Sequence, residues 1–147
     1  MARFLLELKT AAEAAKVAEG SFRREAAKQI AALEQARAFA FRRLNIMQAV
    51  AQAMASADSE EVAVASAFAA LRMRLGWNSD SEARSQVITH FGSVALAMFR
   101  AQAGDDKATE DVHEALASFE QWYAETRGAP FWMLFEHQMP DTPLVDF

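Results

Sequence analysis

Apolar residues recur at helical spacing along almost the whole chain, and no stretch shows the two-residue alternation of a β-strand. This period divides the chain into five helical segments with punctuating residues between them. They cover residues 3–18, 22–55, 60–75, 80–103 and 107–127. The sequence therefore predicts an all-α protein: a five-helix bundle with a long second helix, forming a single helical domain over residues 1–147.

Glycines and short polar residues mark the predicted helix ends. Four of the five glycines stand there: Gly20, Gly76, Gly104 and Gly128. Asp58 or Ser59 is the expected N-cap of the third helix, and Ser79 with Glu82 matches the S-x-x-E capping box. Gly92 lies inside the fourth helix, where it costs about 1 kcal/mol relative to alanine. We therefore expect a close helix crossing at this position.

The apolar positions also predict which side of each of the last three helices faces the core. A side chain that repeats every three or four residues stays on one helix face. The expected inner stripes are Val64, Phe68, Leu71 and Leu75; Val87, Phe91, Val94 and Met98; and Val112, Leu116, Phe119 and Tyr123.

The second helix is unusual in its length. At 1.5 Å per residue, a continuous helix over residues 22–55 measures roughly 50 Å, whereas a compact chain of this size is only about 38 Å across. The helix therefore either breaks, near Asn45, or its end projects into a second subunit. It carries a second apolar stripe, Phe39, Ile46 and Val50, which suits a central helix or a contact with a second subunit. We expect a homo-oligomer, such as a homodimer.

The segment 129–147 is rich in aromatic residues and is broken by prolines, which predicts an extended tail after a short helical turn at 131–137. Its aromatics are Phe131, Trp132, Phe135 and Phe147. The segment either covers the open end of its own bundle or docks on another chain. A membrane-surface role is disfavoured, because acidic residues accompany the aromatics and no Lys or Arg does.

Composition narrows the class of protein. The 147 residues are alanine-rich, 52% hydrophobic and 24% charged, which is typical of a globular protein. Without cysteine, disulfides and thiolate metal sites are excluded, and a reducing cytoplasm is the expected location. Charges interrupt the N-terminal apolar run before it reaches signal-peptide length, and no segment approaches 18 uncharged apolar residues. We expect no membrane association.

Charge is distributed unevenly along the chain. Residues 1–56 hold nine Lys/Arg and five Asp/Glu, while the rest of the chain is strongly acidic and brings the net charge to −5. The simplest interpretation is that the two halves complement each other on packing. Arg24, Lys28 and Arg42 form a basic stripe on the second helix that a nucleic acid would use. Glu25 and Glu34 interrupt it, so nucleic-acid binding is disfavoured.

The histidines provide the only candidate metal site. Glu110 and His113 have the Glu-x-x-His spacing that places both side chains on one helix face, and His90 is a third candidate ligand. The other two histidines lack a carboxylate three residues earlier, so a capped acidic first helical turn explains Glu110 better. No nucleophile motif is present.

The sequence thus favours a non-catalytic helical interaction or structural subunit without a cofactor, with Phe131, Trp132, Phe135, Phe147, Phe39, Ile46 and Val50 as candidate partner-binding residues. One alternative is a metal- or small-ligand-binding bundle, with or without catalysis. A further alternative is a regulator associated with nucleic acid.

Overall fold

The computed structural model describes residues 2–22, 27–79, 81–104 and 107–135, and only the backbone of 17–22 and 27–31. Every regular element in this part of the chain is helical. The elements are α1 (Ala2–Phe22), α2 (Ala27–Met54), α3 (Glu60–Leu75), α4 (Glu82–His90), α5 (Gly92–Gln102), α6 (Ala108–Arg127) and the 3₁₀ helix η1 (Phe131–Phe135). The predicted all-α bundle is confirmed.

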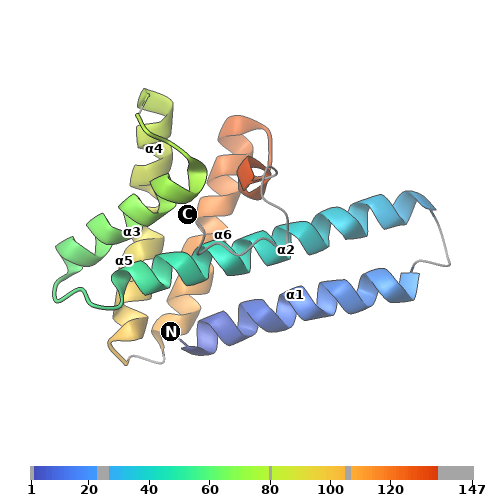
Figure 1. Cartoon of the computed structure of the whole chain (residues 1–147), viewed down its shortest axis with the longest axis horizontal. Coiled ribbons are helices and arrows are strands. Elements are labelled where there is room, and N and C mark those ends of the chain that lie inside the picture. Colours follow the sequence, from blue (N-terminus) through green and yellow to red (C-terminus); the bar gives the residue numbers. More distant parts are fainter. Residues whose placement is uncertain (1, 23–26, 80, 105–106, 136–147) are drawn as a thin grey trace.

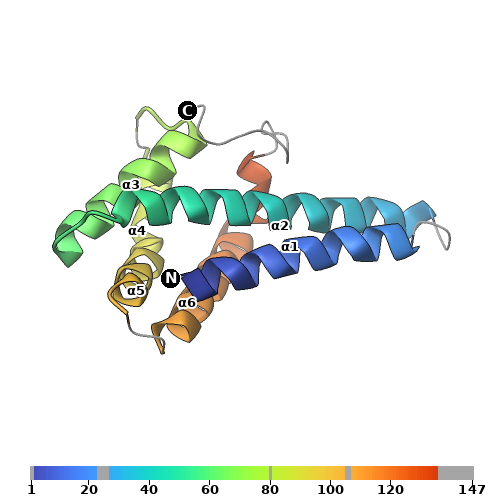
Figure 2. The ribbon, with the colours of Figure 1, turned by 60° about the horizontal axis from the view of Figure 1, so that its bottom comes forward.

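The helices α1 and α2 form a long antiparallel hairpin (Figure 1). The remaining helices gather at the half of α2 that leads to Met54, so the other half of the hairpin projects from the bundle (Figure 2). α2 is continuous through Asn45, and its 28 residues span about 42 Å. The alternative of a break near Asn45 is therefore wrong. Contact of the projecting end with a second subunit stays a prediction.

Local sequence signals set most of the helix ends. The Ser59 hydroxyl accepts a hydrogen bond from the Val62 amide at 3.3 Å, and the Ser81 hydroxyl accepts one from the Arg84 amide at 3.2 Å. Gly76 and Gly128 end their helices with φ of 72° and 73°, a conformation that other residues rarely adopt.

Several helix ends differ from the prediction. The N-cap of α4 is Ser81 and not Ser79 of the predicted capping box, and Phe22, the predicted start of the second helix, belongs to α1. α1 runs through Gly20 to Phe22, past the expected end at Ala18, because glycine also tolerates the helical conformation. The predicted helix over residues 80–103 is divided at Phe91 into α4 and α5. The weak helix former Gly92 follows directly. A Cβ atom at Gly92 would lie 3.4 Å from the Phe68 ring, so α3 and α5 approach closely there, as expected.

The core forms where these helices meet. Seven of the eight residues in the two predicted inner stripes of residues 80–127 are at most 3% exposed, and Tyr123 is also buried. In α3 the fully buried face consists of Ala63, Ala67, Leu71 and Leu75, while Val64 and Phe68 are only half-buried. No described helix is long and apolar enough to cross a membrane.

Candidate interaction surfaces

Six aromatic side chains pack where α6, η1 and the start of α5 meet, and we call them the aromatic cluster: Phe91, Phe119, Tyr123, Phe131, Trp132 and Phe135. Phe131 is its centre. Its ring makes edge contacts with Phe119 at 4.8 Å, Tyr123 at 5.2 Å and Trp132 at 5.0 Å between centroids. Such edge-to-face pairs add about 0.5–1.5 kcal/mol each beyond their buried area. Burial also raises the pKa of the Tyr123 phenol.

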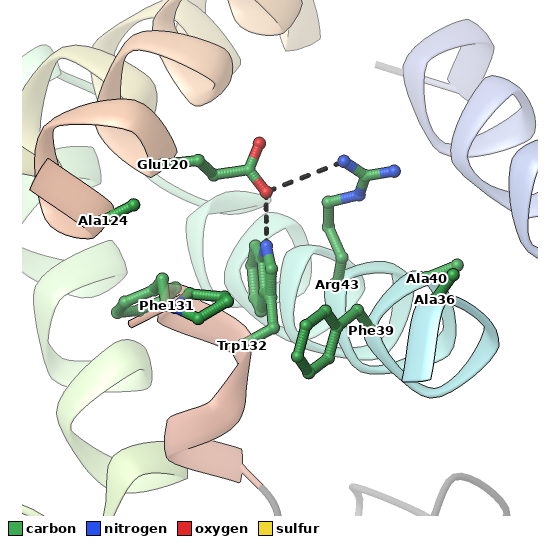
Figure 3. Close-up of a pocket in the computed structure, with 9 residues that line it drawn as sticks. Ala36, Phe39, Ala40, Arg43, Glu120, Ala124, Phe131 and Trp132 are labelled. Carbon is green, nitrogen blue, oxygen red and sulfur yellow. Dashed lines mark hydrogen bonds and ion pairs between the residues drawn. The ribbon is translucent and has the colours of Figure 1, made fainter. Parts of the chain in front are cut away.

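The Glu120 carboxylate on α6 joins this cluster to α2. It accepts a hydrogen bond from the Trp132 indole Nε1 and lies 3.6 Å from Arg43 Nη1 (Figure 3). Arg42 Nη1, also on α2, donates to the Trp132 carbonyl at 3.5 Å. The polar end of a buried tryptophan thus has a partner, which its burial requires. The geometry fixes η1 between α6 and α2.

A shallow groove of about 300 Å³ lies beside this contact, between α2, α6 and η1 (Figure 3). Its α2 wall is formed by Ala36, Phe39 and Ala40. The Phe39 side chain is half-buried, and the Arg42 guanidinium stands 5.9 Å from its ring centroid. Among the predicted partner-binding residues in the described chain, Phe39 is thus the one that keeps a substantial open surface.

The other predicted partner-binding residues are placed differently. Phe131, Trp132 and Phe135 are 1%, 4% and 0% exposed and pack on their own chain. Ile46 and Val50 are core residues at 1% and 0%, because α3 and the rest of the bundle cover that side of α2. Of the two alternatives for this stripe, these two residues therefore match the central helix of a bundle, and they leave no open surface for a partner. Phe147 lies outside the described residues.

The histidines do not converge. His113 turns away from Glu110 toward α1, where its Nε2 contacts the Glu7 carboxylate and its ring lies 4.8 Å from the Phe4 ring. The hydrogen bond with His113 lowers the pKa of Glu7. His90 stacks on Trp122 with centroids 3.7 Å apart.

Glu110 is exposed and lies with Asp111 and Glu114 in a shallow surface hollow. Within the described residues, no three His, Asp or Glu side chains form a group that could hold a metal ion. The structure therefore does not bring Glu110, His113 and His90 together.

Of the basic stripe predicted on α2, only the side chain of Arg42 lies within the described residues. Arg42 and its neighbour Arg43 point toward η1 and α6, where they contact Trp132 and Glu120. The side chains of Arg24 and Lys28 lie outside the described residues.

Sequence reasoning missed the outer face of α3, formed by Val62, Ala65, Ala69 and Met73. All four side chains are exposed, Val62 by 48% and Met73 by 59%. At 100° per residue, they lie opposite the buried face of the same helix. α3 has no charged residue between Val62 and Leu71, so it is apolar on both sides. A helix that is apolar all round is normally buried all round.

The sequence contains this face as well. The stripe opposite to Val64, Phe68, Leu71 and Leu75 is equally apolar, so the helical period alone does not tell which of the two stripes is buried. Figure 1 shows α3 at the edge of the molecule, with α2 and α5 on its inner side.

Comparison of the chain with protein-family models, with curated proteins and with solved structures found no match.

Proposed function

We propose that this protein is a non-catalytic helical subunit whose work is to bind protein chains, and that the outer face of α3 is its main binding surface. A cytoplasmic location is part of the proposal. The observation that carries it is the exposure of Val62, Ala65, Ala69 and Met73 on a helix without charges at its centre. Exposed apolar patches of this kind mark interaction sites.

The aromatic cluster supports the same interpretation, because its rings pack within their own chain. Its polar groups, Glu120, Arg43 and the Trp132 indole, contact one another. This arrangement is typical of a structural joint between helices. Within the described residues, the outer face of α3 is by contrast an exposed apolar surface on which Val62 and Met73 remain open.

Photo-crosslinking inside the cells that express the protein tests the proposal. A photoreactive benzoyl-phenylalanine replaces Ala69 in the outer face, or Ala117, an exposed alanine on α6, as the matched control. We expect irradiation to yield covalent protein adducts heavier than the monomer from position 69 and not from position 117. Adducts from neither position, or equally from both, would contradict the proposal.

A further inference from the structure

We propose that the partner of the outer face is a second copy of this chain, with two α3 helices packed antiparallel across a twofold axis. This inference rests on the proposed function and adds the identity of the partner. It follows from the size and the charge pattern of the α3 side chains.

Side-chain size fits a helix that pairs with itself. Ala65 and Ala69 are small and lie at the middle of the face, while the larger Val62 and Met73 lie at its two ends. In a twofold contact residue i of one subunit meets residue j of the other, and j meets i. An antiparallel pair therefore places Val62 opposite Met73 twice, with the alanines at the crossing, where small residues permit a short interaxial distance.

Charge favours the antiparallel direction. Glu61 is in the first turn of α3 and Arg72 is in the last. They are eleven residues apart, so their directions around the helix axis differ by only about 20°. Both therefore flank the outer face on the same side. An antiparallel pair brings Glu61 of each copy toward Arg72 of the other, whereas a parallel twofold pair would place the charged flanks of the two copies on opposite sides of the contact and form no such ion pairs.

The same flank continues into an apolar groove of about 440 Å³ between α3 and α5, lined by Val64, Phe68 and Leu96 together with Glu61. It enlarges the surface that a second copy covers. A contact formed by one helix pair and this groove still buries a small area compared with other protein interfaces. We therefore expect a dissociation constant on the order of 1–100 µM.

Sedimentation velocity of the purified full chain, over concentrations of about 1 to 500 µM, tests the assembly because this range brackets the expected dissociation constant. We expect a concentration-dependent monomer–dimer equilibrium. Ala69→Glu should weaken it at least about tenfold, by burying a charge at the crossing. Ala117→Glu, the same change on exposed α6, should leave it unchanged. Circular dichroism of both variants serves as the control that their helix content is unchanged.

Charge exchange tests the direction of packing. Glu61→Arg and Arg72→Glu each place like charges at two symmetric contacts, and we expect each to weaken its own dimer about tenfold. An equimolar mixture of the two variants should form a heterodimer as stable as the wild-type dimer. If each variant alone dimerises normally, or the mixture stays monomeric, the antiparallel α3 contact is wrong.

Other occupants of the face give different results. A wild-type chain that is monomeric at every concentration, yet crosslinks from position 69 to another protein, contradicts this inference and leaves the proposed function standing. A monomer whose position 69 crosslinks to its own residues 136–147 contradicts both.

Discussion

The aromatic cluster and the outer face of α3 are both apolar, but they have opposite relations to the rest of the chain. In the cluster, large rings from α6 and η1 surround Phe131, and the Glu120 carboxylate accepts the hydrogen bond of the Trp132 indole. On the outer face, Val62, Ala65, Ala69 and Met73 remain exposed, although the helix carries no charge between Val62 and Leu71.

The difference shows that apolar content alone does not identify a binding surface. The most aromatic segment of the sequence is used for internal packing, at least over Phe131–Phe135. The stripe that stays exposed is a plainer one, formed by Val62, Ala65, Ala69 and Met73. The predictions below test whether these two regions differ as much as their burial indicates.

The largest effect should come from emptying the centre of the cluster. We expect Phe131→Ala to lower the free energy of unfolding by about 3–5 kcal/mol, because the cavity loses ring contacts on several sides. Met73→Ala on the outer face should change the free energy of unfolding of the monomer by less than about 0.5 kcal/mol. Urea unfolding at low protein concentration measures both. Comparable losses would mean that the outer face is packed in solution.

The two faces of α3 can be compared by making the same alanine-to-leucine change on each of them. Ala67 is fully buried, and Ala67→Leu should cost about 1–3 kcal/mol of stability, because the added atoms overpack the contact with neighbouring helices. Ala69→Leu should be nearly neutral in the monomer, since its side chain faces solvent. Thermal unfolding below the dimer concentration range measures the pair. A loss for Ala69→Leu as large as that for Ala67→Leu would contradict the assigned faces.

The polar contact between the aromatic cluster and α2 should contribute less to the free energy of unfolding than the packing of Phe131. Glu120→Ala leaves the Trp132 indole N–H and Arg43 without this partner, and we expect a loss of about 1–2 kcal/mol in urea unfolding. Glu125→Ala, on the same helix, removes only the exposed contact with Gln121 and serves as the control. If both variants lose the same stability, the indole contact does not stabilise η1.

The smallest effect concerns the contact between α1 and α6. The folded state holds the pKa of Glu7 below its ordinary value of 4.5. Its contribution to stability is therefore present above about pH 4.5 and is lost as the pH falls through the lower folded value. Glu7→Gln should reduce the loss of stability between neutral pH and pH 3 in urea titrations, with little change in the helix content. If Glu7→Gln and the wild type lose the same stability between neutral pH and pH 3, the contact of Glu7 with His113 does not contribute to stability.

A good part of the fold could be read from local pattern. Ser59, Gly76 and Gly128 act at helix ends because capping depends on a few neighbouring backbone groups. The stripes of α4–α6 were found because each has one apolar and one polar side.

The candidate sites were harder to predict, since they depend on which elements meet. His113 has a carboxylate three residues earlier, at Glu110, yet it contacts Glu7, which is 106 residues away in sequence. Arg42 was a member of the basic stripe that the sequence predicts, yet its guanidinium donates a hydrogen bond to the Trp132 carbonyl of η1.

The sequence by itself determined that the chain is helical, where most helices begin and end, and which stripe of α6 is inward. These features follow from period, capping and glycine conformation, which act over a few residues. Only the tertiary structure decided that Ile46 and Val50 are core, that Phe131–Phe135 pack on their own chain, and that Val62 and Met73 remain exposed. The reason is physical: the period of a helix defines its faces, but only the neighbouring elements determine which of two apolar faces is covered.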